Sequence, residues 1–179
     1  MLLFGARQTG KSSLLRALTP PGAVMIDLQD RRARLRYERT PGLLADELLA
    51  RRDRRLTVCV DEIQKVPALL DDVQLLSDRH PGRFDLFITG SSARRLRAGA
   101  ANLLPGRAHS YRLFPVLAPE RAGYFESAVL PAFRSPSGGG KFPGVPIEDR
   151  LVWGGLPGVI LEPVARRSAT LAAYAEVYL

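Results

Sequence analysis

Residues 2–15 read LLFGARQTGKSSLL. The eight residues from Gly5 to Ser12 fill every fixed position of G-x-x-x-x-G-K-[ST], the pattern of a phosphate-binding loop. An apolar run over residues 1–4 precedes the pattern and is typical of a buried strand. A run with leucines on one face follows it over residues 12–18 and predicts a helix. Because strand, loop and helix occur in the required order, we predict a phosphate site here.

The chemistry of such a loop explains its residue types. Gly5 and Gly10 let the backbone curl around an anion, so that successive N–H groups point inward. The N-terminus of the following helix adds the positive end of its dipole. Lys11 is predicted to contact the β- and γ-phosphates, and Ser12 to bind Mg²⁺. The predicted nucleotide-binding set is Gly5, Ala6, Arg7, Gln8, Thr9, Gly10, Lys11, Ser12 and Ser13.

The composition is that of an ordinary soluble globular protein. The chain has 179 residues, of which 46% are hydrophobic and 25% charged, enough for one α/β domain and a small appendage. No apolar run is long enough to span a membrane, and Met1 leads directly into the first strand without a signal peptide. The only cysteine, Cys59, excludes an internal disulfide and is expected in the core. We therefore expect a cytoplasmic protein without membrane partners.

Arginine dominates the charge, which is +8 at neutral pH. Residues 31–55 alone hold nine arginines and only four acids, Glu38, Asp46, Glu47 and Asp53. A solvated basic helix accounts for this pattern, and so does contact with nucleic acid. No known nucleic-acid-binding motif accompanies the arginines, so nucleic acid remains the alternative partner.

Short apolar runs alternate with helical patterns over the first two thirds of the chain. This βαβαβαβ order, followed by a fifth strand, predicts an α/β fold with a mostly parallel five-stranded sheet between helices. Thr40 and Pro41 are expected to cap and begin one of the helices. Ligands bind such sheets at the carboxyl ends of the strands. The expected strands cover residues 1–4, 23–28, 56–60, 84–89 and 109–114.

The pattern changes after Pro115, and we expect two domains, 1–114 and 115–179. The second is predicted to be a helical, lid-like region. Its expected helices cover residues 119–129, 147–153 and 162–179, and a flexible Gly/Pro/Ser-rich loop covers 131–146.

A second cluster of reactive side chains follows the apolar run over residues 56–60. Asp61 and Glu62 come directly after it, as in the second nucleotide-site motif of phosphate-loop ATPases. Asp61 is predicted to hold Mg²⁺ through water, and Glu62 to orient and polarise the attacking water. Thr89 and Ser91 are both candidates to sense the γ-phosphate, and we favour Ser91. Arg107 is a candidate for stabilising transition-state charge, in cis or across a homo-oligomer interface.

The sequence resembles the AAA+-type ATPase domain of a group of bacterial and archaeal ATP-binding proteins. The matching blocks are GARQTGKSSLL, VCVDEIQKVP, FITGSSARRL, LLPGR with YRLFPVLAPE, and GGLP near residue 155. The resemblance implies ATP and Mg²⁺ as ligands, with Lys11, Ser12, Asp61 and Glu62 in the roles above. Ala6 departs from the family, where proline is frequent. Family members usually continue into a further C-terminal domain, so we expect an adjoining domain that this sequence lacks.

These observations favour an ATPase whose hydrolysis drives a conformational change. Three alternatives stay open: a nucleotide-dependent regulatory switch with slow turnover, a kinase of small molecules, and a nucleic-acid-binding module. Glu62 favours hydrolysis, because a protein that only binds nucleotide does not need it. The DEIQK block argues against the kinase, since it resembles a hydrolase motif.

Overall fold

The computed structural model describes residues 1–91, 108–117, 120–121 and 142–178. The chain divides into two compact units. Unit 1 contains residues 1–5 and 11–113, and unit 2 contains residues 6–10 and 114–179.

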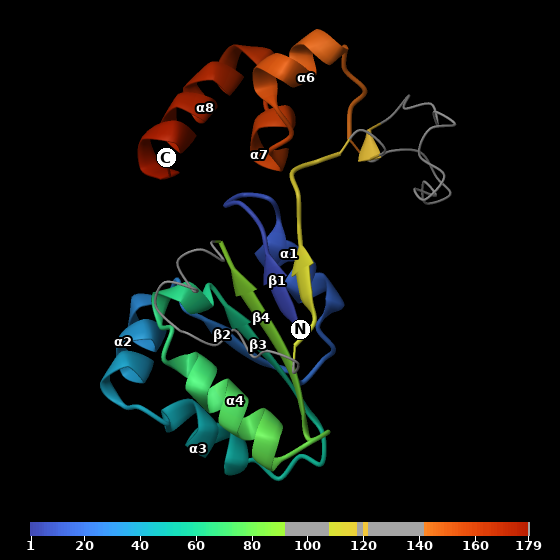
Figure 1. The fold of residues 1–179 in the computed structure, drawn as a ribbon. Coiled ribbons are helices and arrows are strands. Elements are labelled where there is room, and N and C mark those ends of the chain that lie inside the picture. Colours follow the sequence, from blue (N-terminus) through green and yellow to red (C-terminus); the bar gives the residue numbers. More distant parts are fainter. Residues whose placement is uncertain (92–107, 118–119, 122–141, 179) are drawn as a thin grey trace. The chain divides into compact units, whose positions relative to one another are not determined.

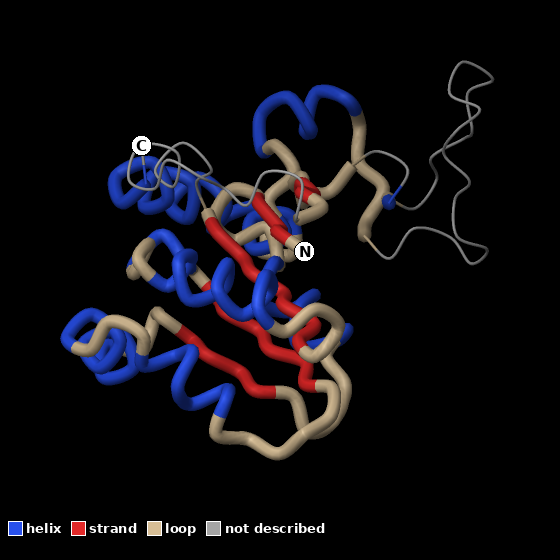
Figure 2. The backbone as a smooth tube through the Cα atoms, turned by 60° about the horizontal axis from the view of Figure 1, so that its bottom comes forward, coloured by secondary structure: helices blue, strands red, loops and turns tan. Residues whose placement is uncertain are grey.

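Unit 1 is built on a five-stranded sheet in which every pair of neighbouring strands is parallel, in the order β2-β3-β4-β1-β5 (Figure 1). The predicted α/β fold with a five-stranded sheet is therefore confirmed. Figure 2 shows the strands side by side as one layer. The strands are β1 (Leu2–Phe4), β2 (Val24–Asp27), β3 (Leu56–Asp61), β4 (Phe84–Gly90) and β5 (Ser110–Arg112).

Strand order determines which face of the sheet each helix covers. The chain crosses from β1 to β2 in one direction and returns through β3 and β4 in the other. Because parallel crossovers are right-handed, the first connection and the later ones cover opposite faces. Figure 1 accordingly shows α3 and α4 packed together in front of the sheet. The helices of unit 1 are α1 (Lys11–Leu18), α2 (Arg31–Arg39), α3 (Leu43–Leu49) and α4 (Leu69–Arg79), with a short 3₁₀ turn, η1 (Ile63–Lys65).

The core of unit 1 centres on β3. Val58, Cys59 and Val60 have no exposed surface, as expected for a strand covered on both faces. Burying one valine of this kind stabilises a fold by about 1.5–3 kcal/mol. Burial raises the pKa of the Cys59 thiol, and the hydrogen bond with Thr19 opposes this only in part. Cys59 is therefore a core residue, as predicted, with little tendency to ionise.

The start of α3 differs from the prediction. The helix begins at Leu43, and Gly42 precedes it in the left-handed conformation, with φ 82°. Thr40 and Pro41 therefore do not begin the helix. The physical reason lies on α4, where the buried carboxylate of Asp72 accepts backbone hydrogen bonds from Leu44 and Ala45, in the first turn of α3. A side chain distant in sequence thus replaces the local cap.

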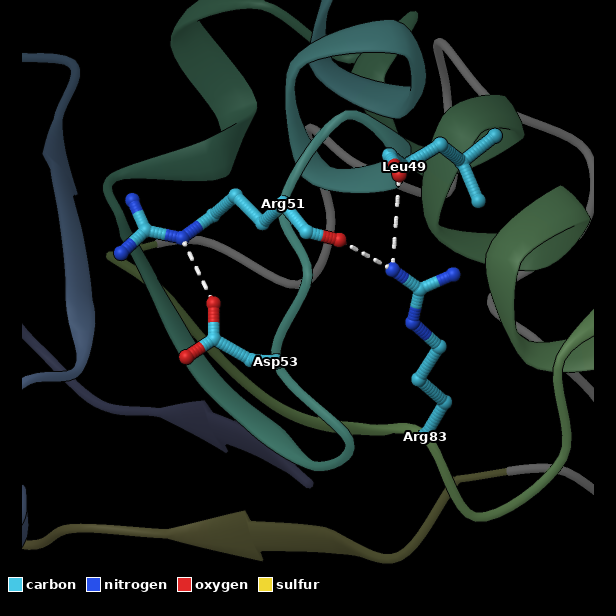
Figure 3. A network of polar contacts seen from close by, with 4 residues as sticks. All are labelled: Leu49, Arg51, Asp53 and Arg83. Carbon is cyan, nitrogen blue, oxygen red and sulfur yellow. Dashed lines mark hydrogen bonds and ion pairs between the residues drawn. The ribbon is translucent and has the colours of Figure 1, made fainter.

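A loop between α3 and β3 is held by Arg83, which precedes β4 (Figure 3). The Arg83 guanidinium donates to the carbonyl oxygens of Leu49, at 3.4 Å, and Arg51, at 2.6 Å. Within the loop, Nε of Arg51 donates to Asp53 at 3.3 Å. These contacts fix the path of the chain into β3.

Unit 2 contains α6 (Ile147–Trp153), α7 (Pro157–Ile160) and α8 (Val164–Tyr178), so helices occur in both later regions where they were predicted. Val159 and Ile160 of α7 are buried, and Arg167 of α8 donates to the carbonyl oxygen of Ile160 at 3.2 Å. Most of the helix predicted over 119–129 and most of the loop predicted over 131–146 lie outside the described residues.

The glycine pair between α6 and α7 has a steric role. The amide of Val116 donates to the carbonyl oxygen of Gly155 at 2.7 Å. A Cβ on Gly155 would lie 2.7 Å from the carbonyl oxygen of Val116, closer than real Cβ atoms approach. Only glycine lets the two backbone segments come together in this way.

Among the described residues, no helix combines the length and the apolar character needed to cross a membrane.

Candidate active site

The predicted phosphate loop connects β1, which ends at Phe4, to α1, which begins at Lys11. Two of its residues have positive φ, Gln8 at 61° and Gly10 at 93°. The hydroxyl of Thr9 donates to the carbonyl oxygen of Ala6 at 2.8 Å and closes the turn. No atom lies within 4 Å of where a Cβ on Gly10 would be, so this glycine serves the backbone conformation rather than close packing. Alternating backbone conformations of this kind form the concave N–H arrays that bind anions.

Lys11 and Ser12 are the first two residues of α1, where the positive end of the helix dipole lies. Lys11 is buried, at 4% exposed, which is uncommon for a lysine side chain. A buried ammonium group at a helix N-terminus suits an anionic ligand.

The carboxyl end of β3 carries the second cluster. Asp61 is the last residue of the strand and is 3% exposed; Glu62 follows it and is 7% exposed. Glu62 has φ 62°, a left-handed conformation that costs a residue with a side chain about 1–2 kcal/mol. Strain of this size, at the end of a central strand, is common at functional sites.

Thr89, on the neighbouring strand β4, joins the two acids. It has no exposed surface, and its hydroxyl donates to the carboxylate of Asp61. The same hydroxyl accepts the backbone N–H of Glu62 at 3.1 Å. One buried hydroxyl therefore fixes both the carboxylate of Asp61 and the turn at Glu62.

Gln64 forms a second bridge at the same edge of the sheet. Its Nε2 donates to the carboxylate of Glu62 and to the hydroxyl of Ser91, the latter at 2.8 Å. Its Oε1 accepts the backbone N–H of Ser91 at 3.3 Å. Both ends of one amide thus connect Glu62 to the residue that follows β4.

The residues predicted to hold magnesium have suitable chemistry. Mg²⁺ prefers oxygen ligands, keeps several waters, and is usually bound by one or two carboxylates together with substrate phosphates. Ser12 supplies a hydroxyl and Asp61 a buried carboxylate. No group of three or more His, Cys, Asp or Glu side chains capable of holding a metal occurs in the described part of the chain. A hydroxyl and a carboxylate are oxygen donors of the kind that Mg²⁺ prefers.

Sequence reasoning identified most of these residues, with one omission, Gln64. It named Asp61 and Glu62, and treated Thr89 and Ser91 as alternatives for a single role. The structure gives these two residues different partners: Thr89 contacts Asp61, and Ser91 contacts Gln64. Gln64 was not singled out, although it belongs to the distinctive DEIQK block. Arg107 lies outside the described residues.

The chain belongs to the AAA domain family, whose model matches residues 1–121. The predicted AAA-type, phosphate-loop assignment is therefore confirmed, and the chain is a nucleotide-binding, ATPase-like protein. The matched range contains both clusters described above.

One similar solved structure is that of C. elegans PCH-2, with a TM-score of 0.41 and 17% sequence identity. The similarity covers 66% of this chain and 35% of the PCH-2 chain, so this chain spans about a third of that protein's length. No curated protein matches the sequence significantly.

Proposed function

We propose that the protein hydrolyses ATP with Mg²⁺ and uses hydrolysis to drive a conformational change. One observation carries this proposal: a strained, buried Glu62 stands beside a buried Asp61 at the end of a central strand, and a neighbouring threonine fixes both. A protein that only binds nucleotide needs the metal-binding acid but not the second one. Residues 1–114 would form the ATPase core and residues 115–179 a lid-like region.

The binding roles follow from the position of each group. The loop from Gly5 to Ser13 would enclose the phosphates with its N–H groups, and Lys11 would neutralise the β- and γ-phosphates. Ser12 and Asp61 would hold Mg²⁺, Asp61 through water. When bound, Mg²⁺ neutralises charge on the phosphate oxygens.

The catalytic role falls to Glu62, whose carboxylate would orient and polarise the attacking water. Ser91 would contact the γ-phosphate or the water. Arg107 would stabilise charge in the transition state, in cis or from a second copy of the chain. If it acts from a second copy, the defect of Arg107→Ala depends on protein concentration.

Binding and turnover test the proposal together. Lys11→Ala removes a buried cation at the phosphates and is expected to weaken binding of a fluorescent ATP analogue by about 10- to 100-fold, the equivalent of a charged hydrogen bond. It should also abolish Mg²⁺-dependent phosphate release. Arg16→Ala is the matched control, because it removes an exposed positive charge from the same helix. Equal affinity in Lys11→Ala and wild type would refute the proposed role of Lys11 at the phosphates. Binding without phosphate release in the wild type would favour the regulatory switch.

A second candidate function, nucleic-acid binding, is favoured by exposed arginines in unit 1. Eight of the nine arginines in residues 31–55 are exposed. Arg36, Arg51 and Arg55 pair with carboxylates, whereas Arg52 and Arg54 form no ion pair with any described residue. The contacts from Arg83 to Leu49 and Arg51 hold the loop that presents them (Figure 3).

Salt dependence tests this candidate. Each phosphate contact contributes about 0.9 to the slope of log K against log salt for duplex DNA. The double variant Arg52→Ala, Arg54→Ala should therefore lower the slope by about 1.8. An unchanged slope, or no binding by the wild type at low salt, would exclude this surface.

A further inference from the structure

Glu62 has a side chain with several rotatable bonds, yet a water-activating carboxylate must keep one orientation. Reactive groups work best when their rotamers are locked by neighbouring hydrogen bonds. The backbone of Glu62 is already fixed, because its N–H donates to Thr89 at 3.1 Å and its φ is 62°. This leaves the question of what fixes the side chain.

Gln64 provides that restraint. It lies in η1, the 3₁₀ turn that directly follows Glu62, and its Nε2 donates to Oε2 of Glu62. An amide can point either way, but here its other end is fixed as well. Oε1 accepts the backbone N–H of Ser91 at 3.3 Å, and Nε2 also reaches the Ser91 hydroxyl at 2.8 Å.

The bridge spans two strands. Glu62 follows β3 and Ser91 follows β4, and these strands pair in register up to Val60 and Ile88. Beyond this register the backbone ladder ends, and Thr89 and Gln64 continue the connection through side chains. The Glu62 carboxylate is therefore held against the end of β4 rather than left to rotate.

We propose that Gln64 is the positioning residue for Glu62, holding its carboxylate in the orientation that activates water and linking it to Ser91. This inference rests on the proposed ATP hydrolysis. Gln64 does not itself contact the reacting atoms; its amide orients the group that does. The role needs a donor facing Glu62 and an acceptor facing Ser91, and among uncharged side chains of this length only glutamine offers both.

Three substitutions separate the hydrogen bonds from the shape of the side chain. Gln64→Met keeps the length and loses both the donor and the acceptor. Gln64→Glu keeps the acceptor for the Ser91 N–H but, when ionised, has no donor for Glu62. Gln74→Ala, on α4, is the control, because it removes the same amide group elsewhere in unit 1.

The experiment measures kcat and KM for ATP by phosphate release, together with affinity for a fluorescent ATP analogue. Loss of hydrogen bonds that orient a reactive group typically costs about 10- to 100-fold, so kcat should fall by this factor in Gln64→Met and Gln64→Glu. KM and nucleotide affinity should stay within about twofold of wild type, because a positioning role affects only the transition state. The Gln74→Ala control should retain wild-type kcat.

The outcomes separate the two claims. If the wild type releases phosphate and Gln64→Met keeps its kcat, the positioning role is wrong and the ATPase proposal stands. A parallel loss of kcat and nucleotide affinity would also overturn the role, because it would indicate a general disruption of the site. If the wild type binds ATP without releasing phosphate, the ATPase proposal fails and the role of Gln64 fails with it.

Discussion

The hydroxyl of Thr89 on β4 donates a hydrogen bond to the carboxylate of Asp61 on β3, and both groups are buried. The same oxygen accepts the backbone N–H of Glu62 at 3.1 Å. A carboxylate that would hold Mg²⁺ through water and the backbone turn at the neighbouring acid therefore depend on one side chain. The strand that separates β3 from β1 thus contributes directly to the site.

Thr89→Val is expected to damage stability and turnover together. Valine has nearly the same shape but leaves the Asp61 carboxylate and the Glu62 N–H without this partner. A buried polar group that loses its hydrogen-bond partner lowers the free energy of unfolding by about 1–3 kcal/mol, which urea unfolding can measure. Turnover at saturating ATP should fall as well. Thr89→Ser, which keeps the hydroxyl, should retain most of the activity; equal losses in both variants would show that the methyl group matters instead.

The Asp72 carboxyl predicts a pH-dependent stability. Burial, the larger effect, raises the pKa of Asp72, and the backbone hydrogen bonds from Ala45 and Leu44 oppose it. The folded state therefore holds this proton more tightly than the unfolded chain. The stability that the protonated Asp72 contributes is fully present below pH 3.8, the ordinary pKa of an aspartate. It is lost as the pH rises through the pKa of Asp72 in the folded state. Asp72→Asn keeps a carbonyl acceptor for α3 and removes the buried charge.

The Asp72→Asn variant should therefore be more stable than wild type at pH 7, and the difference should shrink as the pH falls toward 3.8. Urea midpoints across this range provide the measurement. Asp71→Asn, which changes an exposed acid one residue earlier, should show a smaller effect. A stability difference that does not change with pH would contradict the burial argument.

Gly155→Ala should loosen unit 2. Its Cβ would lie 2.7 Å from the Val116 carbonyl oxygen and 3.2 Å from Cβ of Pro115, so the backbone segments must separate. Overpacking of this kind costs about 1–3 kcal/mol. Hydrogen exchange at the Val116 amide, which donates to Gly155, should become faster. In Gly158→Ala the new Cβ meets no atom closer than 3.7 Å, and exchange at Val116 should stay unchanged.

Local sequence patterns were sufficient to predict the strands and most helices of unit 1, because apolar runs and leucine spacing directly reflect burial. They were insufficient where distant residues determine the result. Asp72 caps α3 from another helix, so the prediction that α3 begins at Thr40 and Pro41 was wrong. The partners of Thr89 and Gln64 became apparent only when strand order placed β4 beside β3. The positions of Asp61 and Glu62 at the end of β3 were predictable, whereas the side chains that form hydrogen bonds with them were not.

The role of Glu62 in hydrolysis is tested by phosphate release from wild type and Glu62→Gln at saturating ATP and Mg²⁺, with nucleotide affinity measured for both. Glutamine keeps the size of the side chain but cannot polarise water as a carboxylate does. We expect equal affinity and a loss of turnover of about 100-fold or more, the usual contribution of a positioned general base. Turnover in Glu62→Gln equal to that of the wild type would contradict it, because the strained acid at the end of β3 would then have no part in hydrolysis.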